Sequence, residues 1–469
     1  MRKADKRAIE KGVTEEELVS RAGTSIAETL AERFGKDAKM LFVTGKGNNG
    51  KDGLVCADVL RKKGYEKIDE YRVADMTADM RDDYDVIVDC VFGTGLKSAP
   101  SGDYKKAIEL INDKKGYKVS VDAPSGLNSD NGKVAGVCVK ADLTIAIGEL
   151  KLGYFLNDGK DYTGEIEVKD VGIDVSDEDA VIFSEKDVVE KLPKRKENSN
   201  KGSYGKVTII GGSKKYVGGS LLTLNSLSAI KSGAGYTAIL VPESLYSTYV
   251  ARVLETVTFT GKDDGETFVK DFDGMDLALD FSDVICYGNG IGVSRGVYDN
   301  LTYILKKSTK KVLIDADGLN VLSEYGVGAL KEKNCEVLLT PHVKEFSRLT
   351  GKSVEDVCDN PVGLAKEFAK EYGVTVVLKS NSTVITDGEK VALNVNGNDG
   401  LAKAGSGDVL SGLIAGLMAR LNYFDSAVAG TYIFGYSADK IAEKTSRTTL
   451  TPVEVISGFS DFFKKAEKI

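Results

Sequence analysis

The sequence predicts an α/β protein of two domains, each with a mainly parallel sheet covered by helices. Three observations lead to this prediction. The chain has 469 residues, and at about 150 residues per domain this length suits two or three domains. Apolar, strand-like runs alternate with helix-like runs along most of the chain. Glycine is abundant, with 51 residues against 7 prolines, which suits tight turns between strands and helices.

In the first domain, strands are expected at 39–44, 85–92, 118–122 and 143–147, with a helix over 54–63. The strands are continuous apolar runs, as in a parallel sheet buried on both faces. Glycine-rich loops follow several of them. In open α/β sheets ligands bind at the carboxyl ends of the strands. We therefore expect the binding residues in these loops.

A polar, aperiodic stretch at 192–203 is interpreted as a linker between domains 1–195 and 196–469. After this stretch, strand-like and helix-like runs alternate again. Strands are expected at 206–210, 284–287, 312–315, 336–340 and 374–379, and long helices over 405–420 and 425–443. The loop motifs differ between the two halves, so the halves are not repeats.

Composition argues against several classes of function. The formal net charge is −8, which disfavours nucleic-acid binding. A single histidine and the absence of a CxxC pair argue against a zinc site. The sequence shows no signal peptide and no run of ~18 apolar residues, so no membrane segment is expected. The six cysteines are predicted to be reduced thiols of a cytoplasmic protein.

The loop at 44–53 follows a strand and opens a helix. It matches the dinucleotide-binding pattern GxGxxG at Gly45, Gly47 and Gly50. It also matches most of a P-loop, but Asp52 follows Lys51 where Mg²⁺ binding needs a hydroxyl. A third interpretation, a plain turn with no ligand, stays open for the loop taken alone.

Carboxylates lie near the ends of two further strands. Asp89 is inside a strand that leads to Gly93-Thr-Gly95, and Asp122 begins an Asp-Ala-Pro-Ser-Gly turn. A buried carboxylate is costly unless it is paired or binds a cation. Asn49, Asp89 and Ser125 would give oxygen ligands for K⁺, Na⁺ or Mg²⁺, and Asp122 would be an acid or base. Simple capping of loop amides is the alternative for each aspartate.

Together these motifs, with Lys151 and Gly153, resemble the NAD(P)H-hydrate epimerase domain over about residues 1–190. The resemblance implies a Rossmann-like three-layer α/β/α fold, K⁺ bound by Asn49, Asp89 and Ser125, and Asp122 as acid/base. It implies hydrate contacts from Asn48, Asn49, Gly50, Lys51, Asp52, Gly93, Thr94, Gly95, Leu96, Lys97, Ser98, Ala99 and Asp122. Lys51 replaces a glycine that is usual in the family, and Ser20-Arg21 replaces a usual Glu-Asn.

In the second half, Gly405-Ser-Gly-Asp408 precedes a long apolar helix. Amides at a helix N-terminus bind anions, and Asp408 is placed to take a proton from a hydroxyl that attacks a phosphoryl group. A helix-start role is the alternative for Asp408. Residues 379–383 follow a strand and offer a cation and hydroxyls, unless they form only a hairpin turn. His342, the only histidine, is either a structural hydrogen bonder or a ligand contact.

The second half resembles the ADP/ATP-dependent NAD(P)H-hydrate dehydratase, a ribokinase-like α/β/α domain, over about 200–465. Here Asn289 replaces a usual proline, Ser380 a glycine and Ser406 a threonine. The resemblance implies nucleotide contacts from Lys379, Ser380, Asn381, Ser382, Thr383 and Gly407. It implies hydrate contacts from Gly219, Gly292, His342 and Asp408, with Asp408 catalytic.

The two resemblances together predict a bifunctional enzyme that repairs hydrated NADH or NADPH. The expected partners are the hydrates, K⁺, and Mg²⁺ with ADP or ATP, without nucleic acid or membrane. A homo-oligomer is expected. The sequence decides neither the nucleotide nor the preferred hydrate. Two alternatives stay open: a ribokinase-like small-molecule kinase with an accessory dinucleotide-binding domain, and a non-catalytic dinucleotide-binding protein.

Overall fold

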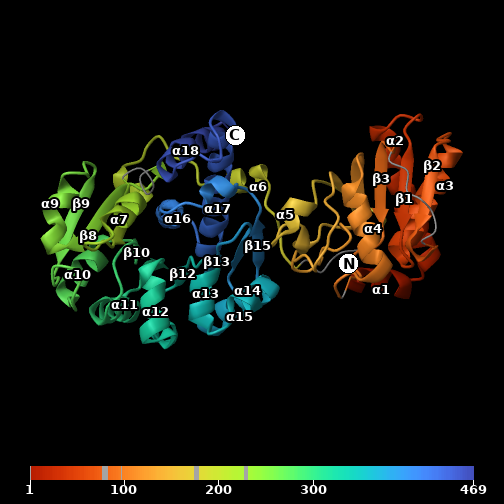
Figure 1. The fold of residues 1–469 in the computed structure, drawn as a ribbon. Coiled ribbons are helices and arrows are strands. Elements are labelled where there is room, and N and C mark those ends of the chain that lie inside the picture. The colour runs from red at the N-terminus through yellow and green to blue at the C-terminus, as the bar shows by residue number, and fades with distance from the viewer. Residues whose placement is uncertain (1, 76–82, 97, 174–178, 226–230, 469) are drawn as a thin grey trace. The chain divides into compact units, whose positions relative to one another are not determined.

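The computed structural model describes residues 2–75, 83–96, 98–173, 179–225 and 231–468. The chain folds into two compact units, Met1–Asp179 and Ala180–Ile469 (Figure 1). Each contains one sheet with helices on both faces, so the predicted α/β fold is confirmed. None of the described helices is long and apolar enough to cross a membrane. All six cysteines lie in the described part of the chain and are free thiols, as predicted.

The boundary between the units differs from the predicted one at 195/196. Residues 180–195 pack on the second unit, because Val181 forms a β-bridge with Ala392 and Lys191 pairs with Asp425 at 2.7 Å. Helix α6 (Glu185–Lys191) is short, and the most polar stretch follows it. Polarity alone therefore placed the boundary too late.

The first unit contains a six-stranded sheet in the order β2-β1-β3-β4-β5-β6, with every pair parallel. Its strands are β1 (Met40–Thr44), β2 (Ile68–Arg72), β3 (Val86–Cys90), β4 (Tyr117–Val121), β5 (Leu143–Ile147) and β6 (Glu165–Lys169). Its helices are α1 (Arg2–Glu10), α2 (Glu15–Arg33), α3 (Asn48–Lys62), α4 (Gly102–Asp113) and α5 (Gly159–Tyr162).

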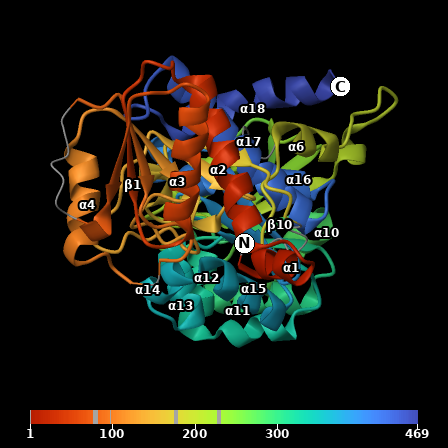
Figure 2. The same ribbon diagram turned by 90° about the vertical axis from the view of Figure 1, so that its right-hand side faces the viewer.

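Alternate residues of these strands build two separate cores. Met40 and Phe42 of β1 pack in the cluster that contains α2 and α3, whereas Leu41 and Val43 pack in the cluster that contains α4. This alternation follows from the two-residue period of a strand. Figure 2 shows α2 and α3 together on one side of β1 and α4 on the other. The result is the three-layer arrangement that was predicted.

The second unit contains a nine-stranded sheet in the order β15-β14-β13-β12-β11-β10-β7-β8-β9. Its strands are β7 (Lys206–Ile210), β8 (Tyr236–Pro242), β9 (Thr256–Gly261), β10 (Val284–Tyr287), β11 (Lys311–Ile314), β12 (Val337–Leu339), β13 (Thr375–Leu378), β14 (Thr383–Thr386) and β15 (Val391–Asn394). Only the pairs β13–β14 and β14–β15 are antiparallel, within the strands that the structure describes.

Helices cover both faces of this sheet. Helices α16 (Ser406–Met418), α17 (Tyr423–Lys444) and α18 (Pro452–Glu467) share one core with β7, β8 and β10. The opposite side is covered by α11 (Arg295–Lys307), α12 (Asp317–Tyr325), α13 (Val343–Thr350) and α15 (Pro361–Tyr372) (Figure 1). The other described helices of this unit, besides α6, are α7 (Val217–Leu224), α9 (Tyr246–Val250), α10 (Phe272–Phe281) and α14 (Val354–Asp359).

Candidate functional sites

The glycine-rich loop of the first unit brings the N-terminus of α3 directly over the ends of β1 and β3. A Cβ at position 45 would lie 2.1 Å from the Val91 carbonyl oxygen, and one at position 50 would lie 2.1 Å from the Gly45 carbonyl oxygen. Only glycine permits such close backbone packing. The first amides of α3, which starts at Asn48, are thereby presented at the strand ends, where helix N-termini bind anions.

Asp89 organises the loop that follows β4. It is fully buried and accepts hydrogen bonds from the Ser120 hydroxyl at 2.8 Å, the Ser125 amide at 2.9 Å and the Ser125 hydroxyl at 2.5 Å. Burial raises the pKa of Asp89, and the bonds from Ser125 oppose that shift. The predicted pair of Asp89 and Ser125 is therefore in direct contact.

Asn49 is the unsatisfied polar group of this region. Its side-chain oxygen and nitrogen are both buried without a hydrogen-bond partner in the described structure. A Cβ on Gly93 would lie 3.4 Å from Asn49 Cγ and 2.7 Å from Asp122 Oδ2, while the neighbouring Phe92 amide donates to Ser125 at 2.8 Å. Asn49, Asp122 and Ser125 thus border one short segment. An unpartnered buried amide beside a hydroxyl and a carboxylate fits an oxygen-ligated cation such as K⁺.

Asp122 has an unusual backbone and two strong side-chain partners. Its φ is 64°, a conformation that is costly for a non-glycine residue and concentrates at functional sites. Its Oδ1 accepts from Lys151 Nζ at 2.6 Å, and its Oδ2 accepts from the Thr94 amide at 3.0 Å. The Tyr154 hydroxyl donates to its carbonyl oxygen. The carboxylate is consequently fixed toward the 93–95 loop.

Sequence reasoning assigned no role to Lys151. The ammonium is buried and bonds both Asp122 and the Ile147 carbonyl oxygen, the latter at 2.8 Å. The loop after β5 carries Lys151 to the end of the neighbouring strand β4, so only the strand order brings the two residues together. The motif containing Lys151 and Gly153 was the available signal.

Lys51 and Arg21, the two charged residues that depart from the family pattern, both form ion pairs at the surface. Lys51 Nζ donates to Glu15 at 2.8 Å, with more than half of each side chain exposed. Arg21 pairs with Glu17 at 2.5 Å and donates to the Val171 carbonyl oxygen at 3.2 Å. Of the remaining predicted contacts in the 93–99 loop, Gly95, Ser98 and Ala99 are exposed and Leu96 is partly buried, while Lys97 lies outside the described residues.

In the second unit, Asp408 lies in the first turn of α16. Gly405, at the N-cap, has a φ of 94°, which favours glycine. The Asn289 side-chain amide donates to Asp408 Oδ1 at 2.8 Å, and a Cβ on Gly219 would lie 3.6 Å from the same oxygen. Burial raises the pKa of Asp408 to about 6. The predicted residues Gly219 and Asp408, from α7 and α16, are therefore adjacent.

A buried ion pair lies beside Asp408. Lys379 Nζ is 3.0 Å from Asp315 Oδ1, and the Ser411 hydroxyl donates to Asp315 Oδ2 at 2.5 Å. Burial alone would raise the pKa of Asp315, but the Lys379 ammonium holds it below its ordinary value. A Cβ on Gly407 would lie 3.3 Å from Lys379 Nζ, so two predicted nucleotide contacts meet here. Asp315 is the last residue of the strand expected at 312–315, but sequence reasoning did not assign it to the site.

The other residues predicted for this site make fewer contacts with Asp408 and the Lys379–Asp315 pair. Gly292 has a φ of 82°, and its amide donates to Asp317 at 2.9 Å. In the 380–383 loop, Ser380 and Asn381 are exposed and Thr383 is partly exposed, whereas the Ser382 hydroxyl is buried without a partner in the described structure. The Ser406 hydroxyl at the start of α16 is buried in the same unpartnered way.

His342 caps α13. Its Nδ1 accepts from the amides of Lys344 and Glu345 at 3.1 and 3.2 Å, and Glu345 Oε2 accepts from the His342 amide at 2.8 Å. Because Nδ1 accepts, the ring proton is on Nε2. Burial lowers the pKa of His342. His342 therefore has the structural hydrogen-bonding role that was one of its two alternatives. Even so, 48% of its side chain is exposed.

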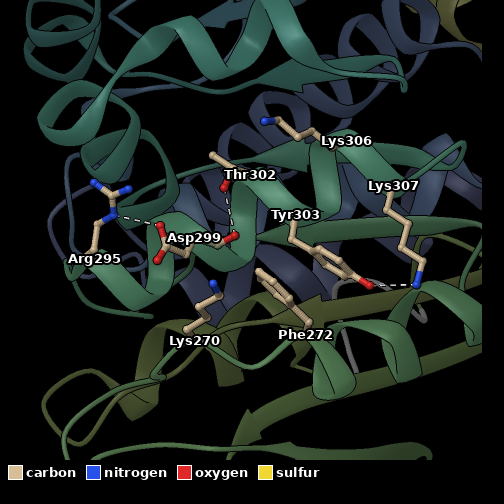
Figure 3. Close-up of a pocket in the computed structure, with 8 residues that line it drawn as sticks. All are labelled: Lys270, Phe272, Arg295, Asp299, Thr302, Tyr303, Lys306 and Lys307. Carbon is tan, nitrogen blue, oxygen red and sulfur yellow. Dashed lines mark hydrogen bonds and ion pairs between the residues drawn. The ribbon is translucent and has the colours of Figure 1, made fainter.

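A separate hollow of about 530 Å³ lies between α10 and α11. Figure 3 shows its lining: Lys270, Phe272, Arg295, Asp299, Thr302, Tyr303, Lys306 and Lys307. None of the predicted site residues lines it. Its arginine and two of its lysines are neutralised by ion pairs, for Arg295 pairs with Asp299 at 2.8 Å, Lys306 with Glu332 at 2.6 Å and Lys307 with Asp276 at 2.7 Å. This pocket is therefore a weak candidate for an anion.

The fold and the geometry define an α/β protein with one candidate site in each unit. Each site has a carboxylate near the carboxyl ends of parallel strands and beside the N-terminus of a helix. Residues 207–458 match a family model described as NAD(P)H-hydrate dehydratase, and segments 15–73 and 66–153 match one described as YjeF-related protein N-terminus. The bifunctional NAD(P)H-hydrate repair enzyme Nnr of Thermofilum pendens is 33% identical, with 97% of this chain and 93% of that protein covered. The chain belongs to the family of bifunctional NAD(P)H-hydrate repair enzymes.

Solved structures agree for the second unit. The ADP/ATP-dependent NAD(P)H-hydrate dehydratase of Bacillus subtilis, co-crystallised with ATP and Mg²⁺, is 28% identical with a TM-score of 0.53, covering 61% of this chain and 99% of that protein. A ribokinase-like superfamily protein of Enterococcus faecalis is 24% identical with a TM-score of 0.52, covering 63% and 99%. The second unit therefore has the predicted ribokinase-like fold.

Proposed function

We propose that this chain restores NADH or NADPH from their C6 hydrates in two steps. The first unit interconverts the R and S hydrates, and the second unit dehydrates the S form with ADP or ATP as phosphate donor. The observation that carries the proposal is the cluster at α16, where Asp408 lies beside Gly219 and Lys379 lies beside Gly407. This cluster offers a base, a cation and helix amides at one place.

In the dehydratase unit, Asp408 removes the proton of the C6 hydroxyl, and the freed oxygen attacks the terminal phosphoryl group of the nucleotide. Lys379 and the first amides of α16 neutralise the negative charge that builds on that phosphoryl group. The ring nitrogen then expels the C6 phosphate, and loss of a C5 proton restores the double bond. A pKa of about 6 for Asp408 leaves it ionised at neutral pH and near the working range of a general base.

Mg²⁺ would enter with the nucleotide. No group of three or more His, Cys, Asp or Glu side chains suited to a metal ion occurs in the described ranges, and Mg²⁺ is commonly held by one or two carboxylates together with substrate phosphates. When bound, it would neutralise phosphate charge. The carboxylates of this site are already engaged, since Asp315 pairs with Lys379 and Asp408 accepts from Asn289.

In the epimerase unit, Asp122 acts as the acid/base, with the Lys151 ammonium at 2.6 Å as its partner. The amides of residues 48–52 and the 93–99 loop bind the hydrate. For Lys51 we assign this contact to the backbone, because the ammonium is bonded to Glu15. Asn49, Asp89 and Ser125 would hold K⁺, which supplies a fixed positive charge beside the 122–125 loop.

The assay starts from a mixed R/S NADH hydrate and follows recovery of the absorbance of the reduced nicotinamide. Protein, Mg²⁺, K⁺ and either ADP or ATP are added. Full recovery with one nucleotide supports both activities and identifies the donor. Recovery that stalls once the S form is spent would refute the epimerase assignment. No recovery with either nucleotide would refute the dehydratase assignment and favour a ribokinase-like small-molecule kinase.

We also propose that the chain assembles into a homo-oligomer and acts in the cytoplasm. The arrangement of its six cysteines, none of which is paired in a disulfide in the described structure, supports the second point. Light scattering of the purified protein measures the assembly, and a mass equal to the single chain of 50.3 kDa would contradict it. Parallel assays with NADH hydrate and NADPH hydrate establish which of the two is preferred.

A further inference from the structure

Asn289 lies where the ends of β10 and β11 meet α16. It is fully buried and flanked by Gly288 and Gly290, whose φ values are 121° and 65°. A Cβ at position 288 would lie 2.1 Å from the Asp315 carbonyl oxygen. The glycines thus let the loop pass directly over the end of β11, and this path delivers the Asn289 side chain between two carboxylates.

The Asn289 amide uses both of its hydrogens on these carboxylates. Nδ2 donates to Asp408 Oδ1 at 2.8 Å and to Asp315 Oδ2 at 3.2 Å. Oδ1 accepts from the Cys286 thiol at 3.4 Å. Because ionised carboxylates only accept, the amide nitrogen has to face them, so the chemistry fixes which way the side chain points.

We propose that Asn289 is a positioning residue that holds Asp408 Oδ1 in place and so presents Oδ2 to the hydroxyl of the hydrate. The proposal rests on the proposed role of Asp408 as base. Asp315 is itself fixed by Lys379 and Ser411. A continuous chain of polar contacts therefore runs from the nucleotide-facing Lys379 through Asp315 and Asn289 to Asp408.

The charges around Asp408 explain why an amide is needed. Burial is the largest influence on the pKa of Asp408 and raises it. Asp315, which follows β11, and Asp317 of α12 are negative neighbours that raise it further, whereas Lys379, which follows β13, lowers it. Lys379 is already paired with Asp315. The bond from Asn289 is the largest of the influences that favour the ionised form of Asp408. Loss of this donor raises the pKa of Asp408 further.

The sign of the effect on activity follows directly. A base must be ionised, so dehydration rises with pH through the pKa of Asp408. This rise is the acid limb of the pH–activity profile. Removal of the Asn289 amide should move it to higher pH by about one unit. Because the pKa of Asp408 is about 6, kcat/KM at pH 6 should fall about fivefold more than it does at pH 8. ADP binding should change little, because in the described structure the Asn289 side chain bonds Asp408, Asp315 and Cys286 and makes no direct bond to the 379–383 loop.

The experiment measures kcat/KM for the S hydrate between pH 5 and 8.5 at saturating ADP and Mg²⁺. The variants are N289A and N289L, the second of which keeps the side-chain volume without the donor. N300A is the matched control: Asn300 is equally buried, but its side chain bonds the Asp271 amide and the Val269 carbonyl oxygen, both at 2.8 Å. We expect the limb to move in N289A and N289L and to stay in N300A.

An unmoved limb in a folded N289L protein would overturn the proposal, whether or not N289A folds. An equal shift in N300A would overturn it as well, because any lost buried amide would then suffice. The wild-type protein separates this failure from failure of the proposed function. If wild type does not dehydrate the S hydrate, or if D408N remains active, the role of Asp408 itself is wrong.

Discussion

In both candidate sites an aspartate lies near the carboxyl ends of parallel strands, but its hydrogen-bond partners differ. Asp122 is bonded by a buried ammonium, Lys151, and by a backbone amide. Asp408 is bonded by the neutral amide of Asn289. Each site also contains a non-glycine residue in the left-handed region directly after or next to the end of a strand, Asp122 with φ 64° and Ala316 with φ 49°.

The difference teaches how one architecture produces two chemistries. In the second unit a buried carboxylate without a direct cation has its pKa raised to about 6, which suits removal of a proton near neutral pH. In the first unit an ion pair places the Lys151 ammonium beside the Asp122 carboxylate, which suits the proposed role of Asp122 as an acid/base that both removes and returns a proton. In the proposed mechanism, the carboxyl ends of the strands position each site, and the partners of each aspartate determine its role.

The largest effect is expected from D408N. The variant keeps the shape of the side chain but cannot act as base, so dehydration of the S hydrate should fall by roughly 10²- to 10⁴-fold. ADP binding, measured by calorimetry, should persist, and R/S exchange should continue at the wild-type rate. Retained dehydration would show that Asp408 is not the base, and the contrast between the two aspartates would then be wrong.

D122N tests the other side of the comparison. R/S exchange, followed by chromatography of the two hydrates, should fall by roughly 10²-fold or more. Dehydration of pure S hydrate should continue unchanged, because it uses the second unit. Loss of both activities, or a lower thermal midpoint, would indicate damage to the fold instead of loss of an acid/base group.

G93A sharpens the geometry of the first site. The added Cβ would lie 2.7 Å from Asp122 Oδ2 and 3.4 Å from Asn49 Cγ, so the carboxylate has to move. Displacement of a reacting group by about 1 Å can cost up to about 10²-fold, and we expect a loss of about tenfold in R/S exchange alone. G35A is the control, since its Cβ meets nothing within 4 Å. Equal rates in the two variants would contradict this geometry.

The sequence predicted what is local and missed what only the fold brings together. The loop at 44–53 was recognised because strand, glycines and helix follow one another directly. The loop at 405–408 was recognised because its glycines lead straight into a long helix. The Asp122–Lys151 and Asn289–Asp408 contacts join residues 29 and 119 positions apart, and their partners become visible only through the strand order. Strands such as β6 and β9 were missed because their residues are largely half-exposed or exposed and lack a continuous apolar run.

The smallest effect is expected from K51A, which tests whether a departure from the family pattern silences the epimerase. The Lys51 ammonium bonds Glu15 at 2.8 Å on the surface, where solvent and salt screen the pair. The helix amides that we assign to the hydrate belong to the backbone and remain in the variant. R/S exchange should therefore stay within about twofold of wild type, because such surface pairs contribute little. A rise of tenfold or more would mean that the lysine obstructs the site, and a fall of that size would mean that its charge binds the dinucleotide phosphates.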